Sequence, residues 1–214
     1  MDEPRTHPLF EPSSQEVTEA AALRALAHPL RLRALGLLRL YGPSTATRLA
    51  ERCGESAALL SYHLRLLAEA GFVVPAEPAD LESITTHGRD RWWKAAGATT
   101  ITSTPPDDDL PATAAYADYD ATLVAAYSDR ARRWLRVRHE WPRQWRTADN
   151  FSDLALRLTA EQTRSLALEL AEVLSRYRRH DPADGTPPEG ALIVAAQFAV
   201  FPEPEQAPPS ENDS

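Results

Sequence analysis

The 214-residue sequence predicts an α+β fold that is mainly α. Leucines and alanines recur at spacings of three and four residues in several segments, which is the period of an amphipathic helix. Short apolar runs bounded by glycine or proline are fewer, and they predict a small number of strands. Hydrophobic residues make up 43% of the chain and charged residues 25%, so the chain can build a packed core.

Two helices are predicted before residue 42. Ser13 and Glu16 have the Ser-x-x-Glu spacing of a capping box, which predicts a helix that ends near Ala27. Pro29 begins a second helix, whose leucines lie mainly on one side and whose arginines lie mainly on the other. Gly42 and the proline after it end this helix.

Two more helices are separated by a short turn. Ser44 or Thr45 can cap a helix that runs through Cys53, and Gly54 can supply the positive φ of a tight turn. The next helix is predicted over Ser56–Ala70, with the serine as its cap.

The helix Ser56–Ala70 has two different faces. Leu60, Leu64 and Leu67 repeat at i, i+4 and i+7 and predict a core face. Small, polar and basic side chains lie opposite, and they are Ala58, Ser61, Tyr62 and Arg65. The second face is therefore available to bind a partner.

A β-hairpin is predicted after this helix. Gly71 ends the helix, Phe72–Val74 is a short strand, and Asp90–Lys94 is its antiparallel partner. The loop between the two strands forms a wing. This order of helices, turn, strands and wing predicts a winged helix-turn-helix domain over residues 16–97, after a disordered arm at residues 1–15.

A linker at residues 98–111 is expected to lead to a long helix over Ala112–Glu140, which Trp141 and Pro142 must end. The face of this helix is marked by a stripe of mostly aromatic residues, which are Tyr116, Tyr119, Leu123, Tyr127, Ala131 and Trp134. Such a stripe needs a partner. Dimer packing is favoured, and the alternatives are the wall of a ligand cavity or packing on the C-terminal unit.

A small β-α-β unit is predicted at the C-terminal end. Residues 154–158 alternate apolar and polar, Thr159 begins a helix that ends near Arg179, and residues 192–201 form an apolar run. Residues 112–201 are therefore expected to form a dimerisation and possible effector region. The proline-rich and glutamate-rich residues 202–214 predict a disordered tail.

The net charge of −8 is distributed unevenly along the chain. Residues 19–97 carry ten basic and eight acidic side chains, whereas residues 98–214 carry twelve and nineteen. Acidity therefore lies mainly outside the predicted winged helix. Because that domain has a net charge of only +2, phosphate contacts would depend on where its arginines sit.

Several function classes are disfavoured. A single cysteine, Cys53, excludes an intramolecular disulfide and a multi-cysteine metal cage, and no pair of histidines has metal-ligand spacing. No glycine-rich phosphate loop, nucleophile elbow or paired carboxylate site is recognisable, so we expect no enzyme, no cofactor and no metal. Without an apolar run of about 18 residues or a basic leader, the sequence predicts a cytoplasmic protein with no membrane partner.

Three segments carry a resemblance to a known family: Ala25–Leu32, Thr45–Arg52 and Ser61–Val73. They look like the ArsR-type winged-helix transcriptional regulators, and the match covers about residues 23–95. The run Arg89–Trp93 is similar to a branch of this family with an extended C-terminal region, as is Leu158–Glu161, more loosely.

The resemblance implies a dimeric repressor or activator that responds to a metal or a small-molecule effector. The metal sensors of the family carry a Cys-x-Cys pair where this chain has Arg52-Cys53-Gly54, so thiol-based metal sensing is not carried over. We expect a homodimer whose two recognition helices contact half-sites of a palindromic operator in double-stranded DNA.

The candidate DNA-binding residues come from the turn, the recognition helix and the wing. Small side chains permit close approach to base edges, hydroxyl groups can bond bases or phosphates, and arginine can make bidentate contacts. The set is Thr45, Ser56, Ala57, Ala58, Ser61, Tyr62, Arg65, His87, Arg89 and Arg91. Tyr116, Tyr119, Leu123, Tyr127 and Trp134 are the candidates for dimerisation or effector binding.

Other features have two interpretations. His63 is interpreted as a packed, hydrogen-bonded histidine before a ligand, and Cys53 as a small core residue before a redox sensor. Of Trp92 and Trp93, we expect one in the core and one covering exposed apolar surface. The arginines between residues 130 and 138 are interpreted as a solvated face. The alternative to a DNA-binding regulator is a winged-helix protein-interaction module with weak or no DNA binding, which Glu55 and the low domain charge would suit.

Overall fold

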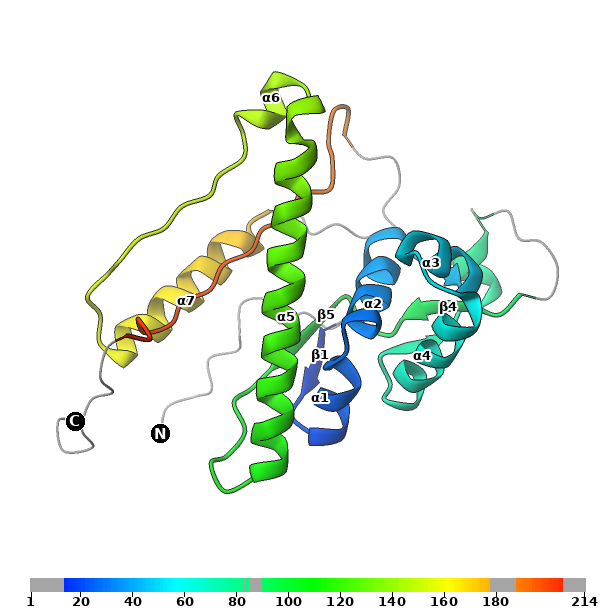
Figure 1. The fold of residues 1–214 in the computed structure, drawn as a ribbon, viewed down its shortest axis with the longest axis horizontal. Helices are drawn as coiled ribbons and strands as arrows, with labels where there is room; N and C mark the ends of the chain where they lie inside the picture. Colours follow the sequence, from blue (N-terminus) through cyan, green and yellow to red (C-terminus); the bar gives the residue numbers. More distant parts are fainter. Residues whose placement is uncertain (1–13, 83, 85–89, 178–187, 206–214) are drawn as a thin grey trace. The chain divides into compact units, whose positions relative to one another are not determined.

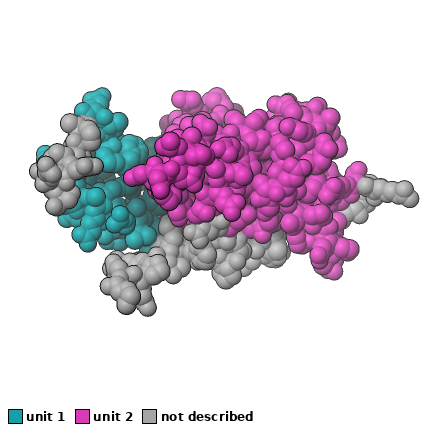
Figure 2. Space-filling view, turned by 90° about the horizontal axis from the view of Figure 1, so that it is seen from below, with its two compact units in different colours: residues 1–9, 150–179, 193–214 teal, residues 10–149, 180–192 magenta. Residues whose placement is uncertain are grey.

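The computed structural model describes residues 14–82, 84, 90–177 and 188–205, and Figure 1 traces the fold. The chain divides into two compact units, which Figure 2 colours separately. The larger unit comprises Phe10–Asp149 with His180–Leu192, and the smaller comprises Met1–Leu9, Asn150–Arg179 and Ile193–Ser214.

The larger unit contains the helices of the predicted winged helix-turn-helix and one long helix. Its helices are α1 (Ala20–Leu26), α2 (Pro29–Tyr41), α3 (Ala46–Cys53), α4 (Ala57–Glu69), α5 (Leu110–Val137) and α6 (Arg143–Arg146), with 3₁₀ turns η1 (Pro78–Leu81) and η2 (Arg138–Glu140). Its strands are β1 (Ser14–Val17), β2 (Ser44–Thr45), β3 (Val73–Pro75), β4 (Trp92–Ala95) and β5 (Thr99–Thr102).

Local capping explains why α3 and α4 begin where the sequence predicts. The Thr45 hydroxyl accepts a hydrogen bond from the Arg48 N–H at 3.3 Å, and the Ser56 hydroxyl accepts one from the Leu59 N–H at 3.2 Å. Gly54 ends α3 at φ 74°, a left-handed conformation that glycine adopts without strain. The predicted helix, turn and helix are confirmed.

Three strands form an antiparallel sheet in the order β2-β4-β3. Val73 pairs with Ala95 and Pro75 with Trp93, which confirms the predicted hairpin. Strand β2 adds an edge that the sequence analysis did not predict, since Thr45 pairs with Trp92. The start of α3 is thereby joined to the strand that follows the wing.

The predicted start of the first helix at the Ser13–Glu16 capping box is wrong, whereas its predicted end near Ala27 is confirmed by α1. Residues Ser14–Val17 form β1, which runs parallel to β5 with Ser14 opposite Thr99, and the first helix begins only at Ala20. The expected linker at residues 98–111 therefore contains a strand. Backbone pairing between these two distant segments satisfies more donors and acceptors than the local capping box would.

The core of the larger unit joins all of its main helices. Leu23, Leu26, Leu35, Leu49 and Phe72 are almost fully buried within it. Helix α5 lies along α1 and contributes its own residues to this core, so no separate domain begins after residue 111 (Figure 1).

The long helix confirms its prediction closely. Helix α5 runs from Leu110 to Val137, η2 follows, and the backbone turns extended at Trp141. Asp109 caps the helix, since its carboxylate accepts a hydrogen bond from the Ala112 N–H at 3.0 Å.

The smaller unit contains α7 (Ala160–Ser175), which begins with the predicted capping box. The Thr159 hydroxyl accepts from the Gln162 N–H at 3.2 Å, and the Gln162 side chain accepts from the Thr159 N–H at 2.9 Å.

The β-α-β unit predicted around α7 is wrong, because neither residues 154–158 nor residues 192–201 form a strand. Large apolar side chains in both segments are exposed, including Leu154 at 79% and Val194 at 70%. Alternation predicts an extended amphipathic segment, but a strand also needs a neighbour to pair with.

Some expectations fall outside the described residues. The disordered arm lies there except for its last two residues, and the disordered tail lies there from residue 206 onward. Within the part of the chain that the structure describes, no helix is both long enough and apolar enough to span a bilayer.

Candidate nucleic-acid interface

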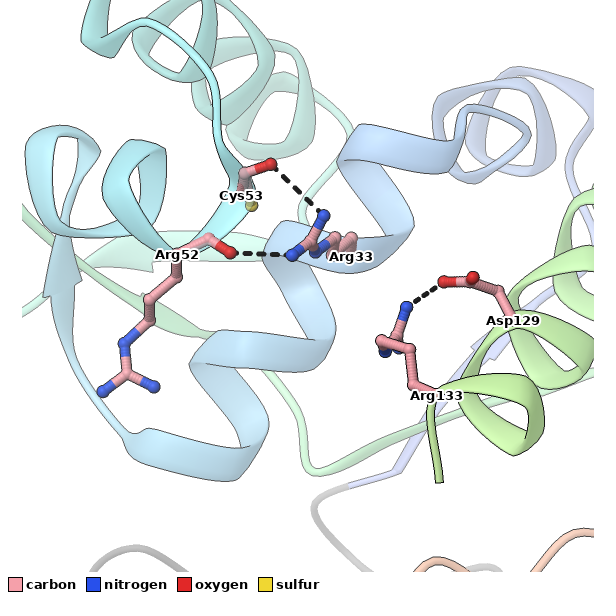
Figure 3. Close-up of polar contacts among 5 residues, drawn as sticks. All are labelled: Arg33, Arg52, Cys53, Asp129 and Arg133. Carbon is pink, nitrogen blue, oxygen red and sulfur yellow. Dashed lines mark hydrogen bonds and ion pairs between the residues drawn. The ribbon is translucent and has the colours of Figure 1, made fainter. Parts of the chain in front are cut away.

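The helix-turn-helix is held in place by an arginine from α2. The Arg33 guanidinium donates hydrogen bonds to the carbonyl oxygens of Arg52 at 2.7 Å and Cys53 at 3.3 Å (Figure 3). These carbonyls belong to the last turn of α3, where the helix itself supplies no donors and where a cation is favourable. The end of α3 is therefore fixed against α2 just before the turn that leads to α4.

Helix α4 divides into the two faces that the sequence predicts. Leu60, Leu64 and Leu67 are fully buried, while Ser61, Tyr62 and Arg65 are exposed, the tyrosine at 50%. The α4 outer face, defined here as Ala57, Ala58, Ser61, Tyr62 and Arg65, is exposed along its whole length. These side chains lie on one broad side of the helix because each has another member of the set three or four residues away.

The contacts of the outer face leave its polar groups accessible. The Arg65 Nε donates to the Ser61 carbonyl oxygen at 3.4 Å, and no acidic residue in the described part of the chain pairs with this guanidinium. The ring of Tyr62 lies edge-on to the ring of His63, with centroids 5.3 Å apart. A guanidinium, a hydroxyl and a phenol are thus presented together.

Thr45 and Ser56 act first as helix caps. The Thr45 side chain is only 4% exposed, so its hydroxyl is not presented to solvent as the sequence analysis expected. Burial follows from the pairing of Thr45 with Trp92 and from the capping bond to α3. Ser56 is exposed, and its hydroxyl keeps a proton to donate after it has capped α4.

The wing residues are only partly described. Arg91 is exposed, and its guanidinium lies 4.1 Å above the centre of the Trp93 ring. His87 and Arg89 lie outside the described residues. Trp93 is 4% exposed and belongs to the core, as expected of one of the two tryptophans. Trp92 lies outside the core cluster but is only 7% exposed, because the Arg48 guanidinium lies over its ring.

Two arginines on α3 were not among the predicted site residues. The Arg48 guanidinium lies 4.7 Å from the centre of the Trp92 ring, and the Arg52 guanidinium lies 4.2 Å from that of Tyr41. Both side chains line a cavity of about 190 Å³ that has no acidic residue among its described lining residues. The spacing of four residues on one helix was the signal that could have identified them.

The burial of Cys53 and His63 bears on the two interpretations of each residue. Cys53 is half-buried, and this burial raises the pKa of its thiol, which suits a packed residue better than a reactive one. His63 is packed as expected, with 5% exposure, but its Nδ1 atom finds none of the expected hydrogen-bond partners among the residues that the structure describes.

The aromatic stripe of α5 changes character along the helix. Tyr119 is 5% exposed against α1, and Tyr116 and Leu123 are partly buried beside it. Tyr127 is 37% exposed. Trp134 packs edge-on against Trp141, with ring centroids 5.2 Å apart, and its Nε1 donates to the Asp149 carboxylate at 2.8 Å.

The arginines near the end of α5 fit the interpretation as a solvated face in part. Arg133 pairs with Asp129 one turn away (Figure 3), and Arg138 lies 3.5 Å from the Asp149 carboxylate. The first pair is exposed, so it neutralises charge more than it stabilises the fold, whereas Asp149 in the second pair is half-buried.

Comparison with known proteins identifies one region. Residues 26–75 match the family model described as "Helix-turn-helix domain", and this span runs from the end of α1 to the end of β3. No curated protein matches the chain. The matched span contains α2, α3 and α4, whose packing and exposed outer face are described above. The chain therefore carries a helix-turn-helix domain at residues 26–75.

Proposed function

We propose that this protein is a sequence-specific, ArsR-like transcriptional regulator that binds a palindromic DNA operator as a homodimer. One observation carries the proposal. The α4 outer face exposes a guanidinium, a hydroxyl and a phenol, while the opposite face of the same helix is fully buried. A helix with this division can enter the major groove without disturbing the core that holds it.

Base reading is assigned to the α4 outer face. Arg65 has the geometry for a bidentate contact to guanine, Ser61 and Tyr62 can bond base edges or phosphates, and Ala57 and Ala58 allow close approach. Ser56 adds a hydroxyl at the start of the helix. Thr45 contributes indirectly, by capping α3 rather than by exposing its side chain.

Backbone contacts are assigned to the arginines that flank α4. Arg48 and Arg52 lie on α3, and Arg91 lies at the base of the wing, each resting over an aromatic ring. These rings restrict the guanidinium groups and so reduce the entropy lost on binding a phosphate. His87 and Arg89 are assigned to backbone contacts as well in this proposal.

Homodimerisation is assigned to the outer half of α5. Val124, Tyr127 and Leu135 are exposed at 60%, 37% and 46%, on a helix whose inner half is packed against α1. Exposed apolar residues in succession favour a protein partner. In this proposal a small-molecule effector would act on the same aromatic region, through Tyr116, Tyr119, Leu123, Tyr127 and Trp134.

Selection of bound duplexes from a random-sequence DNA pool tests the function. We expect enrichment of a palindrome whose half-sites lie about one helical turn, ~34 Å, apart. The binding constant should fall as salt rises, with a slope near −0.9 for each phosphate contact. A variant with Arg65→Gln and Ser61→Ala should lose the preference, whereas Arg132→Gln on α5 should keep it.

Failure to enrich any sequence would overturn the proposal. Retention of DNA without preference, together with capture of a defined protein partner in low salt, would instead favour the protein-interaction module. Glu55, which is exposed beside the start of α4, is the feature of the surface that suits that outcome.

A further inference from the structure

Two histidines stack where α2 begins and α4 packs against it. The ring centroids of His28 and His63 lie 4.4 Å apart, with the planes inclined at 39°. His28 is the N-cap of α2, and His63 lies on the buried side of α4. Because Tyr62 lies edge-on to His63, three rings lead in sequence from the start of α2 to the α4 outer face.

Both histidines are arranged to be neutral. The Nδ1 atom of His28 accepts a hydrogen bond from the Leu30 N–H at 3.2 Å, so it carries no proton. The Nδ1 atom of His63 is buried, and no described residue forms a hydrogen bond with it. A proton on the first would remove the cap of α2, and a proton on the second would place an unsatisfied charge in the core.

The environment of His28 and His63 mainly favours the neutral form of both side chains. Arg31 on α2 is anchored to the carbonyl oxygens of Arg24 at 2.7 Å and of Ala25. Burial first, and then the nearby Arg31 cation, lower the pKa of His28, although a backbone hydrogen bond opposes them. Burial, the neighbouring histidine and Arg31 lower the pKa of His63, and Glu55 opposes them from the turn before α4.

We propose that the His28–His63 stack is a positioning element of the DNA-reading surface, which holds Tyr62 and α4 on α2 only while both imidazoles are neutral. Acidification would protonate the pair, separate the rings and displace the outer face. The inference rests on the proposed function for its effect on DNA, but the stack itself can be tested without DNA.

The sign of the pH dependence follows from linkage. A histidine whose pKa is lowered in the folded state stabilises that state at pH values above its ordinary pKa, about 6.5. As the pH falls below about 6.5, the unfolded or displaced form takes up protons more readily, and the stabilisation is progressively lost. The effect therefore belongs to the weakly acidic range.

The test compares two duplexes at two pH values. Affinity for the duplex enriched from the random pool is divided by affinity for a scrambled duplex of equal length. This ratio removes the general gain in DNA binding that any added positive charge produces. For the wild-type protein we expect the ratio to fall on the order of tenfold between pH 7.5 and 5.5.

The variants separate positioning from a purely structural role. His63→Phe keeps a ring against Tyr62 and leaves only His28 to be protonated, so we expect a near wild-type ratio at pH 7.5 and a clearly smaller fall than in the wild type at pH 5.5. His63→Ala should lower the ratio at both pH values. His139→Gln is the control, because this histidine is exposed on η2 and its loss should leave the wild-type profile unchanged.

A second measurement is independent of DNA. Urea unfolding at pH 7.5 and 5.5 should show a larger loss of stability on acidification in the wild type than in His63→Phe. If no duplex is enriched, the proposed function fails while this difference still tests the stack. If a duplex is enriched and His63→Phe keeps the wild-type pH profile in both measurements, the stack proposal alone is overturned.

Discussion

Helices α4 and α5 both carry a regular apolar stripe, but only α4 buries the whole of it. Leu60, Leu64 and Leu67 are each fully buried along α4. On α5, Tyr119 is buried against α1, whereas Tyr127 and Leu135 are exposed two and four turns further on. Apolar periodicity therefore identifies the face of a helix that needs a partner, but not whether the same chain supplies one.

The difference has a consequence for what each helix can do. Since α4 satisfies its apolar face within the larger unit, its opposite face is held rigidly and is free to bind. The apolar stripe of α5 is covered only in the first half of the helix. An additional partner would therefore stabilise the protein by covering the second half.

Leu64→Ala should have the largest effect, because it removes a fully buried side chain at the centre of the α4 packing face. We expect the free energy of unfolding to fall by about 2–5 kcal/mol, measured by urea denaturation. Leu59→Ala on the same helix is the matched control, since Leu59 is 37% exposed and should cost less than about 1 kcal/mol. Equal losses in both variants would contradict the division of α4 into two faces.

Replacing Tyr127 and Leu135, which are exposed in the second half of α5, should weaken the association of two copies of the protein without destabilising the fold. We expect Tyr127→Ala combined with Leu135→Ala to weaken the dimer by about 2 kcal/mol or more, roughly a 30-fold increase in its dissociation constant. Sedimentation velocity over a concentration series measures this change. Arg133→Gln, which lies on the opposite side of α5 from Tyr127 and Leu135, should leave the proposed dimer intact. A double variant that associates as tightly as the wild type would show that this half of α5 is not the dimer interface.

The contrast between α4 and α5 also separates the features that the sequence could predict from those that it could not. The limits of α4 followed from local chemistry, since Ser56 caps its start and Gly71, at φ 78°, follows its end. The reading face and the core face of α4 followed from its period. These features depend on neighbours within a few residues, which the sequence displays directly.

Features that depend on distant partners were missed. Ser14–Val17 became a strand because Thr99–Thr102 pairs with it, and no local pattern connects segments so far apart in the chain. The apolar run at residues 192–201 has the composition of a strand but is not paired as one. The burial of Thr45 was missed for the same reason, since it follows from pairing with Trp92.

Arg65→Gln should change DNA recognition with little effect on stability. We expect it to cost about 1–3 kcal/mol in binding the enriched duplex and to relax the preference at one base pair. Arg52→Gln on α3 should instead weaken binding to all sequences and reduce the salt slope by about 0.9. If both variants weaken binding uniformly, Arg65 contacts the backbone and does not read a base.

Tyr119→Phe should have the smallest effect at neutral pH, because the ring that fills the contact with α1 is retained. Burial, the largest of several causes, raises the pKa of Tyr119 to about 12. A raised pKa means that the folded state prefers the protonated phenol, so its contribution is complete below about pH 10 and is lost as the pH rises toward 12.

The wild type should therefore lose stability faster than Tyr119→Phe between these pH values, as measured by urea unfolding. Tyr127→Phe is the comparison from the outer half of the helix, because burial raises the pKa of Tyr127 as well, although this side chain is 37% exposed. If the fold itself buries Tyr119, Tyr119→Phe should reduce the loss of stability at alkaline pH more than Tyr127→Phe does.

An equal reduction in the two variants would mean that both halves of the stripe are covered to the same extent in solution, which a dimer through the outer half of α5 would produce. Repeating the measurement at concentrations below the dimer dissociation constant separates these cases, because only a contribution from Tyr127 that depends on the partner should then disappear.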